Sequence, residues 1–456
     1  LGIKLKNTTK DNEPINNLDK IVSLCKRRGF IFQNSEIYGG LGSIWDYGPL
    51  GTQLKRNIKE SWWNKMVLER KDIVGLDSSI LMNPDIWKAS GHLDNFTDPL
   101  VECQKCNQRW REDQLNKNCC PACSGELSEA RLFNLMFKTS IGPVEKDSTP
   151  IYLRPETAQG IFVNFNNVTS TTRKKLPFGI AQIGKAFRNE ITTGNFIFRT
   201  REFEMMEMEY FVFPGEDEKW HKYWINESLE WYKSIGINSN KLRVREHGST
   251  EMAHYSKATA DIEYNFSWGW GEITGIANRT DFDLKAHSNA SGENLSIFDD
   301  KTNQHITPYV IEPSIGIDRT VMTLLLDAYN EEESINAKGN SEKRVFLKFD
   351  PEIAPIKIAV LPLSRNEAIL PLSNEIYELL LKSKSINGSI DFDDSQSIGR
   401  RYRRQDEIGT PICITIDFDS LNDNSVTIRD RNTMLQNRVK IENLELSIIK
   451  KLNNIK

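Results

Sequence analysis

The spacing of hydrophobic residues changes along the chain, and the changes predict helices and strands. Apolar residues recur at helical intervals over 18–30, 51–69 and 220–235. Polar and apolar residues alternate over 178–190 and 196–213, which predicts two strands joined by the polar loop 192–195. The pattern of residues 308–329 predicts a strand that leads directly into a helix.

The pattern changes again after Pro351, where a proline-bounded segment ending at Pro355 predicts a domain boundary. Short apolar strands are predicted over 356–361, 413–418 and 425–429, with a helix over 374–382. Strands that alternate with helices indicate a compact α/β domain over 351–456. Residues 18–350 then form the main domain, and the polar segment 1–17 is expected to be mobile.

Composition narrows the classes of protein that fit. The 456 residues carry a formal charge of −4, so any contact with nucleic acid must use local basic patches. Charged residues make up 27% of the chain, and no apolar run reaches the length of a membrane span. We therefore expect no membrane association.

Five of the seven cysteines lie close together, which is not the distribution of a disulfide framework. Cys103 and Cys106 form one C-x-x-C pair and Cys120 and Cys123 another, a spacing typical of a structural four-thiolate zinc site. Cys119 is either a spare thiol or a replacement for Cys120. Free thiols in a zinc site indicate a reducing compartment, so we expect a cytoplasmic protein with a zinc-ribbon-like insertion over about 97–135.

The two predicted strands present unusual residues on one face. Arg188 and Glu190 share a face of the first strand. A face of the second strand carries Arg199, Arg201, Phe203, Met205 and Glu207. Charges are rarely buried without partners. The pattern therefore indicates either an exposed, salt-bridged surface or a site for a ligand with an anion, a flat ring and a cationic group.

The sequences of these segments resemble conserved motifs of the class II aminoacyl-tRNA synthetases. Phe187-Arg188-Asn189-Glu190, followed by Arg199, Phe203 and Glu207, is similar to their motif 2. Ser314-Ile315-Gly316-Ile317-Asp318-Arg319 and the apolar helix after it resemble motif 3, although many members carry Glu where Asp318 stands. Trp45 to Gly51 resembles motif 1, which builds the dimer interface in the family.

Further segments narrow the resemblance to the dimeric glycyl-tRNA synthetases. These segments are 38–41, 90–92, 154–160 and 400–406. The resemblance implies an α+β catalytic domain built on an antiparallel sheet, a second insertion at about 214–265, and a C-terminal α/β anticodon-binding domain. It also implies a homodimer that activates glycine with ATP and Mg²⁺ and transfers the glycyl group to tRNA(Gly), as a ligase forming a carbon–oxygen bond.

The family's ATP site maps onto residues of both motifs. Arg188 and Arg319 are the expected catalytic residues, because fixed cations stabilise the charge that develops on phosphate oxygens. Phe203 is expected to stack on adenine, and Arg319 either covers the other face or holds the γ-phosphate. Further expected ATP contacts, with Glu272 also a Mg²⁺ ligand, are Asn189, Glu190, Phe198, Arg199, Glu272, Ile273, Gly316 and Asp318.

Glycine has no side chain, so its site must hold the ammonium group and leave no room for a methyl group. The resemblance assigns the ammonium to Glu156, Glu207 and Glu312, with Ser314 beside them. Clustered carboxylates repel one another and favour a bound cation. The remaining expected glycine contacts are Phe203, Arg279 and Arg111.

Alternatives remain at three points. The chain could be a synthetase for another amino acid, or a non-catalytic, synthetase-like nucleic-acid-binding protein. The arginines of the segment 400–404 either bind RNA or pack against the rest of the protein. No Ser-His-Asp arrangement is evident, and the six histidines are expected to be structural.

Overall fold

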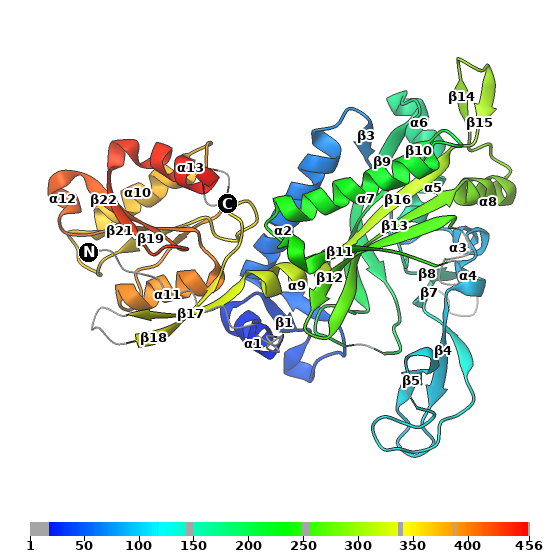
Figure 1. The fold of residues 1–456 in the computed structure, drawn as a ribbon, viewed down its shortest axis with the longest axis horizontal. Coiled ribbons are helices and arrows are strands. Elements are labelled where there is room, and N and C mark those ends of the chain that lie inside the picture. The colour runs from blue at the N-terminus through cyan, green and yellow to red at the C-terminus, as the bar shows by residue number, and fades with distance from the viewer. Residues whose placement is uncertain are drawn as a thin grey trace.

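The computed structural model describes residues 18–454, except 116, 143–148, 193, 249–255, 336–340 and 387. The expectation that residues 1–17 are mobile lies outside the described residues. Two separate sheets, each with its own helices, account for most of the described chain (Figure 1). Within this part of the chain, no helix combines the length and the apolar character that a membrane crossing needs.

The larger sheet has seven strands in the order β11-β12-β13-β16-β10-β9-β3. Their bounds are β3 Ile73–Gly75, β9 Phe178–Phe187, β10 Glu202–Val212, β11 Leu242–Glu246, β12 Ala258–Phe266, β13 Gly269–Thr280 and β16 Tyr309–Gly316. All neighbours are antiparallel except β3 and β9. The expected antiparallel sheet is therefore confirmed.

One face of this sheet is covered by α2 (Pro49–Trp63), α7 (Asp217–Ser234) and α9 (Ile317–Ala328). Leu54, Ile58 and Trp62 of α2 are buried in this layer, as their spacing predicts. The helix continues as a turn of π-helix, Asn64–Leu68, which buries Met66. The prediction of a helix over 51–69 is confirmed, and Pro49 at its first turn explains its earlier start.

Strand β10 divides its side chains between the two faces. Its even-numbered residues from Met206 to Val212 pack into the core beneath the helices. Its odd-numbered residues from Phe203 to Glu209 point to the opposite face, because side chains alternate along a strand. Phe211, at the far end of that face, packs against α5 (Ala158–Val163) and α6 (Phe165–Thr172). Glu207 and Glu209, which lie between Phe203 and Phe211, are on this opposite face, which α2, α7 and α9 do not cover.

The prediction of the second strand, over 196–213, is wrong for residues 196–201. These residues form a loop and a turn, and β10 begins only at Glu202. Asn195 and Phe196 have positive φ angles of 55° and 59°, a conformation that no extended strand contains. A single bridge between Gly194 and Arg199 closes the turn. Arg199 and Arg201 therefore do not share the strand face of Phe203.

Smaller elements surround the larger sheet. The three-stranded sheet β5-β4-β6 projects away from it (Figure 1). Residues 214–265 contribute α7, β11 and β12 to the main sheet and its core. The remaining elements of this part are α1 Leu18–Arg28, β1 Ile31–Gln33, η1 Glu36–Tyr38, β2 Trp45–Tyr47, α3 Pro84–Ala89, α4 His92–Asn95, β4 Thr97–Glu102, β5 Arg109–Arg111, η3 Glu112–Gln114, β6 Arg131–Asn134, β7 Lys138–Ile141, β8 Thr149–Tyr152, η5 Ser239–Lys241, α8 Phe282–Ser291, β14 Ile297–Asp299 and β15 Gln304–Ile306.

The smaller sheet follows the hairpin of β17 (Tyr329–Ile335) and β18 (Ser341–Leu347). Its order is β20-β19-β21-β22-β23, parallel over the first three strands and antiparallel afterwards. The predicted strands and helix are all present, and β20, β23, α11 and α13 are additional. The bounds are β19 Ile358–Pro362, α10 Leu370–Lys382, β20 Ile390–Phe392, α11 Ile398–Ile408, β21 Ile412–Ile416, α12 Ser420–Asp423, β22 Ser425–Asp430, β23 Gln436–Lys440, η6 Ile441–Asn443 and α13 Leu444–Asn454.

Candidate active site

A cleft of about 170 Å³ opens on the face of the larger sheet that α2, α7 and α9 leave uncovered. Strands β10, β13 and β16, the start of α9 and the 188–201 loop all contribute side chains to it. The lining residues are Arg188, Glu190, Ile197, Phe198, Arg199, Thr200, Phe203, Met205, Glu272, Ile273, Gly275, Ser314, Gly316, Asp318 and Arg319. All the expected ATP contacts except Asn189 line this cleft.

Arg188 follows the last residue of β9 and projects into the cleft. Its Nε donates a hydrogen bond to the carbonyl of Pro155 at 3.1 Å. The guanidinium lies between the rings of Phe96 and Phe203, 5.3 Å from each ring centroid. Among the described residues, no carboxylate forms an ion pair with Arg188. The geometry fixes a cation in place and leaves its charge available to an anion.

Arg319 lies in the first turn of α9 and is held from two sides. Its Nη1 donates to the Glu272 carbonyl at 2.9 Å, and its Nε donates to the Phe198 carbonyl at 3.2 Å. The guanidinium stacks on the Phe198 ring at 4.5 Å, and the Glu272 carboxylate is 3.2 Å from Nη1. One face of the planar group is therefore covered, and the cleft lies beside it.

A β-bulge brings Glu272 to the cleft. The register between β12 and β13 shifts between Ile262 and Glu263, so β13 contains one extra residue there. Beyond the bulge, Gly275 and Ala277 face the cavities, and Glu272 lies on the same side although its number is even. Without the bulge, strict alternation would turn Glu272 toward the helices.

Glu190 and Arg199 face each other across the 188–201 loop. Arg199 Nη1 is 3.4 Å from the Glu190 carboxylate, which is buried. Arg201 braces the loop from behind by donating to the carbonyls of Glu190 at 3.1 Å and Gly42 at 2.9 Å. The loop thus presents an acceptor and a donor at one end of the cleft, although neither residue belongs to a strand.

A second cavity of about 240 Å³ adjoins the first and shares Arg188, Met205, Glu272, Gly275 and Ser314 with it. It is lined by the three glutamates that were expected to bind the glycine ammonium, Glu156, Glu207 and Glu312. Thr259, Ala277, His247 and Asp261 complete the lining. Its walls carry a concentration of acceptors beside the fixed cation of Arg188, which fits a small ligand with both an ammonium and a carboxylate.

Glu207 is oriented by donors on both of its oxygens. The Thr157 backbone N–H donates to Oε2 at 2.9 Å, and the Thr157 hydroxyl donates to the same oxygen. The Ser314 hydroxyl donates to Oε1 at 2.8 Å, and Ser314 lies opposite Glu207 in the β10–β16 register. These hydrogen bonds fix the rotamer of Glu207 and the direction of its carboxylate.

Glu156 is also held as a carboxylate. Gln159 Nε2 donates to it at 3.0 Å, and His92 Nε2 lies 3.3 Å from its other oxygen. Burial alone would raise the pKa of Glu156, but His92 and Arg279 outweigh burial and hold this pKa well below its usual range. The cavity therefore keeps negative charge at Glu156.

Arg279 lies behind the carboxylates and not in either cavity. It donates two hydrogen bonds to Asp283, at 2.7 and 2.8 Å, and one to Glu312 at 2.9 Å. The residue is almost fully buried, so its charge must be matched by these acids. Arg279 therefore orients Glu312, which lines the second cavity, but does not line that cavity itself.

Glu209 is a site residue that the sequence pattern did not single out. It lies two residues beyond Glu207 on the same face of β10, and the register places it opposite Glu312. Glu209 is fully buried, and neither of its oxygens has a hydrogen-bond partner among the described residues. Burial and the neighbouring charge of Glu312 raise the pKa of Glu209 well above its ordinary value. The available signal was the repeat of acidic residues at 207 and 209.

The segment Arg154–Thr157 links the two cavities. Arg154 is buried and fastens the segment by donating to the carbonyls of Lys185 at 2.7 Å and Ser78 at 2.8 Å. The Pro155 carbonyl then accepts from Arg188, and the Thr157 N–H donates to Glu207. Consecutive residues of one immobilised segment therefore position the cation of the first cavity and the carboxylate of the second.

Three residues that were expected to contact ATP or glycine use their polar groups for other partners in the protein. Arg111 binds Asp113 at 2.7 Å and Asp98 at 2.9 Å in the projecting sheet, and it lines neither cavity. Asn189 uses its backbone N–H to reach the Leu135 carbonyl at 2.7 Å and also lines neither cavity. Asp318 lines the cleft, but its carboxylate accepts from the Glu204 N–H at 2.9 Å, from Lys55 at 3.2 Å and from Tyr47.

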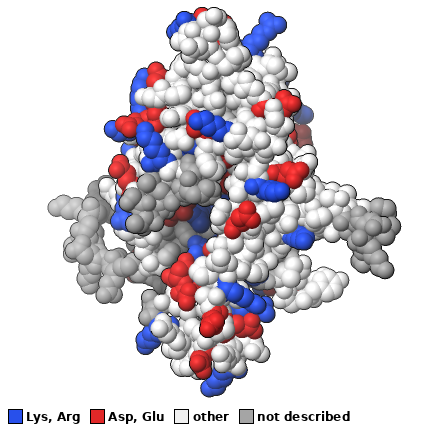
Figure 2. Space-filling model, turned by 90° about the vertical axis from the view of Figure 1, so that its right-hand side faces the viewer, with Lys and Arg blue, Asp and Glu red and all other residues white. Residues whose placement is uncertain are grey.

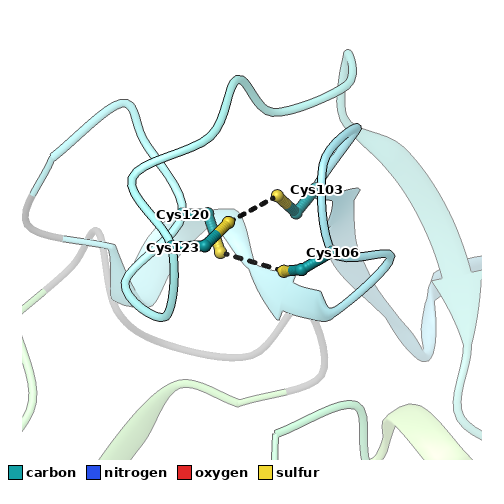
Figure 3. A group of neighbouring side chains, drawn as sticks. All are labelled: Cys103, Cys106, Cys120 and Cys123. Atoms are coloured by element: carbon teal, nitrogen blue, oxygen red, sulfur yellow. Dashed lines mark hydrogen bonds between the residues drawn. The ribbon is translucent and has the colours of Figure 1, made fainter.

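The four cysteines of the two C-x-x-C pairs meet in the projecting sheet (Figure 3). The Sγ atoms of Cys103 and Cys123 are 3.5 Å apart, and those of Cys106 and Cys120 are 3.6 Å apart. Sulfurs about 2.3 Å from a tetrahedral zinc ion would be separated by about 3.8 Å. Cys119 lies outside this group, so the geometry selects Cys120.

Both cysteine pairs have the same backbone turn. After each pair, a residue with positive φ (57° at Asn107 and 55° at Ser124) returns its N–H to the carbonyl of the first cysteine. Gly125 follows the second turn, and a Cβ there would meet Cys103 Sγ at 3.0 Å. The turns and the glycine bring four thiols together at a distance that suits a soft metal ion.

The arginines of the 400–404 segment form part of α11, and most of them have partners within the protein. Arg401 is buried and donates to the carbonyls of Asp393 at 2.9 Å and Leu363 at 3.1 Å. Arg404 pairs with Asp393, and Arg403 pairs with Glu342 of β18. Of the two alternatives for this cluster, the contacts favour packing against the protein. Figure 2 shows the end of the molecule that lies opposite α11, where acidic and basic side chains are interspersed.

Comparisons with known proteins agree with this architecture. The family model "tRNA synthetase class II core domain (G, H, P, S and T)" matches residues 137–329, and "Anticodon binding domain" matches residues 357–451. The glycine–tRNA ligase of Thermobifida fusca is 54% identical over 456 residues, covering 95% of this chain and 98% of the relative. That of Streptomyces coelicolor is 53% identical over 449 residues, covering 94% and 97%.

A solved structure is similar at lower identity. The prolyl-tRNA synthetase of Cryptosporidium parvum, crystallised with halofuginone and AMPPNP, matches with a TM-score of 0.64 and 15% identity. The match covers 96% of this chain and 76% of that one. At this identity the similarity shows the fold alone.

Proposed function

The chain belongs to the glycine–tRNA ligases, a family of class II aminoacyl-tRNA synthetases, and from this premise we propose which of its residues perform each part of the reaction. The family's activity joins glycine to tRNA at the expense of ATP, and this chain has that activity. In the first step the glycine carboxylate attacks the α-phosphate of ATP, pyrophosphate leaves and glycyl-adenylate forms. In the second step the glycyl group passes to the 3′ end of tRNA(Gly).

ATP binds in the first cleft under this proposal. Adenine stacks on Phe203, and Glu190 accepts a hydrogen bond from the adenine amino group. We place Arg319 over the opposite face of adenine, because Phe198 covers one side of the guanidinium and the cleft lies beside it. Arg188 then neutralises the α-phosphate and the attacking carboxylate, for which its fixed position and unpaired charge are suited.

Glycine binds in the second cavity, with its ammonium among the carboxylates. Glu207 and Glu156 offer acceptors oriented by hydrogen bonds, and the Ser314 hydroxyl lies beside them. Arg279 acts as a positioning residue, because it holds Glu312 from behind. A methyl group on the α-carbon would have to displace these fixed side chains, so alanine is excluded by steric clash.

We also propose two metal ions, one that acts with ATP and one that is structural. The Glu272 carboxylate is exposed at the cleft, where it can hold the Mg²⁺ that neutralises ATP phosphates when the nucleotide is bound. Cys103, Cys106, Cys120 and Cys123 hold a structural zinc ion, because four sulfurs leave no open position for catalysis. All seven cysteines are free thiols, which supports a reducing cytoplasm as the location.

The proposed assembly is a homodimer that binds tRNA(Gly). The segment around η1, next to the motif 1 resemblance, exposes Ile37 at 89%, Tyr38 at 88% and Leu41 at 55%. Apolar side chains exposed together on a surface are typical of a protein interface. The residues matched by the anticodon-binding model form the smaller sheet and its helices, which supports contact with the anticodon arm.

The observation that carries the site assignment is Arg188, which lies 5.3 Å from two ring centroids where the cavities meet and has no carboxylate partner among the described residues. We expect ATP–pyrophosphate exchange with glycine alone among the amino acids, and a loss of about a hundredfold or more in Arg188→Ala. Arg365→Ala removes an exposed arginine that pairs with Asp394 in the smaller domain, and should leave exchange unchanged. Normal exchange in folded Arg188→Ala would contradict the assignment.

A further inference from the structure

Among the described histidines, His247 alone lines a cavity of the proposed site. It directly follows β11, and its backbone N–H donates to the Thr259 carbonyl at 2.9 Å, which extends the β11–β12 ladder by one residue. Its side chain lines the second cavity together with Glu207, Ser314 and Glu272. The cavity that we assign to glycine therefore has an imidazole in its wall.

Asp261 fixes the orientation of this imidazole. The Asp261 Oδ2 atom lies 2.6 Å from His247 Nε2, and the aspartate is buried in the wall of the same cavity. A carboxylate beside Nε2 favours the tautomer with its proton on that nitrogen, which leaves Nδ1 as a proton acceptor. Burial and the charge of Glu272 raise the pKa of Asp261, and His247 and Arg245, whose Nη1 is 3.8 Å from the same aspartate oxygen, oppose this shift.

The other described histidines are placed differently. His92 has the Ser90 hydroxyl 2.8 Å from one ring nitrogen and Glu156 3.3 Å from the other, so neither nitrogen is available. His221 and His287 are buried with partners in the protein, and His305 lies on the outer hairpin β14–β15. None of these four lines either cavity, and His254 lies outside the described residues.

The two steps of the reaction differ in whether they need a group that accepts a proton. The glycine carboxylate attacks ATP already ionised, so the first step requires no base. In the second step a ribose hydroxyl of the tRNA terminus attacks the glycyl carbonyl and must lose a proton. Under the proposed assignment, the substrates of both steps meet where the two cavities join, and His247 lines the second of these cavities together with Arg188, Glu207 and Ser314.

We propose that His247, oriented by Asp261, accepts the proton of the attacking tRNA hydroxyl in the transfer step. The hydroxyl oxygen forms a bond to the glycyl carbonyl carbon, and its proton passes to Nδ1 of His247. The carbon–oxygen bond to AMP breaks, and both electrons leave on the phosphate. The Asp261 carboxylate stabilises the imidazolium that results. This assignment rests on the proposed location of glycine beside Glu207 and Ser314.

The test separates the two steps by using His247→Gln. A glutamine side chain can still donate to Asp261 but has no basic nitrogen. We expect single-turnover transfer from preformed glycyl-adenylate to tRNA to fall about a hundredfold or more, and ATP–pyrophosphate exchange with glycine to fall much less. His305→Gln is the matched control, because His305 lies on the outer hairpin, and it should change neither rate.

The pH profile gives a readout that a structural role would not produce. The pH dependence of transfer should differ between the wild type and His247→Gln, because the variant has no basic nitrogen at this position. The charged residues that line the cavity with His247 are Glu156, Arg188, Glu207, Asp261, Glu272 and Glu312, and Arg245 Nη1 lies 3.8 Å from Asp261. Asp261→Asn tests positioning, because transfer should fall further than exchange.

Each outcome decides between the proposals. Unchanged transfer in folded His247→Gln, or an equal fall of exchange and transfer, would overturn the assignment of His247. Absence of glycine-dependent exchange in the wild type would instead overturn the proposed site, independently of His247.

Discussion

At the scale of single residues, the acids beneath the glycine cavity differ in their hydrogen bonds. Glu207 receives hydrogen bonds on both oxygens, whereas Glu209, two residues further along the same strand, has no partner among the described residues. A buried carboxylate without a partner is strongly disfavoured, and burial raises the pKa of Glu209 well above its ordinary value. One strand therefore supplies two acids with different surroundings to the same face.

The raised pKa of Glu209 predicts how stability depends on pH. The folded state favours protonated Glu209, so its contribution is fully present below the ordinary glutamate pKa of about 4.3 and declines as the pH rises above it. Glu209→Gln lacks this decline. We expect the melting temperature of the variant, relative to wild type, to increase by roughly 2 °C or more between pH 5 and pH 8.

Glu378→Gln is the control for this measurement, because Glu378 is exposed on α10. Its difference from wild type should not depend on pH over the same range. A Glu209→Gln difference that stays flat, or decreases with pH, would show that Glu209 is ionised in the folded protein.

The sequence predicted much of the site at this scale, and physical reasons explain what it did not predict. Arg188, Phe203, Glu207, Ser314 and Arg319 line the cavities, as the motif resemblance implied. The sequence did not indicate Glu209, because a buried acid without a partner has the same letter as an exposed one. His247 is separated by many residues from Glu207, and only the sheet order β11-β12-β13-β16-β10 brings them to one cavity.

At the scale of elements, regular periodicity was predictable and local irregularity was not. The spacing of Leu54, Ile58, Trp62 and Met66 predicted the buried face of α2 and its continuation. The loop before β10 was predicted as strand because its residues alternate in polarity, but positive φ angles at Asn195 and its neighbour interrupt the extended backbone. The bulge in β13 depends on pairing between strands, which no single segment encodes.

The projecting sheet depends on its metal if the cysteine site binds zinc. We expect about one zinc per chain in the wild type, and much less in Cys106→Ser, because three thiolates hold the ion less tightly than four. Loss of the ion should also make residues 97–135 sensitive to limited proteolysis, since few apolar contacts hold this small sheet. Metal analysis and mass spectrometry of the fragments measure both effects.

Cys119→Ser provides the matched control, because Cys119 is next to the site but outside the sulfur group. Its zinc content should equal that of the wild type. Equal zinc contents in Cys106→Ser and wild type would rule out the four-thiolate site.

At the scale of the whole molecule, one buried aspartate joins the two parts of the chain. Asp406 of α11 accepts from Arg344 of β18 at 2.8 Å and from Arg429 of β22 at 2.8 and 2.9 Å. Arg431 donates to the Phe349 carbonyl at 2.8 Å, and Glu407 binds Arg28 of α1 at 2.6 Å. The helix with the basic cluster is therefore the junction between the smaller sheet and the rest.

Removal of this aspartate should destabilise the protein strongly. Asp406→Ala leaves the buried Arg344 and Arg429 without their shared counter-charge, and we expect the free energy of unfolding to fall by about 3–5 kcal/mol. Urea denaturation measures this change. Asp394→Ala breaks an exposed pair with Arg365 in the same domain and should have a much smaller effect. Equal effects of both substitutions would contradict the role of Asp406.

The immobilised segment Arg154–Thr157 has a consequence for the choice of substrate. Pro155 positions the cation proposed for the carboxylate end of the amino acid, and Thr157 positions the acceptor proposed for its ammonium end. The span between these two anchors is therefore set by one short stretch of backbone that Arg154 holds in place. If these residues have the proposed roles, the enzyme selects its amino acid by the distance between the carboxylate and the ammonium as well as by the absence of a side chain. An unbranched amino acid with one more methylene, such as β-alanine, would have no side chain to clash and would still fail to bridge the anchors correctly.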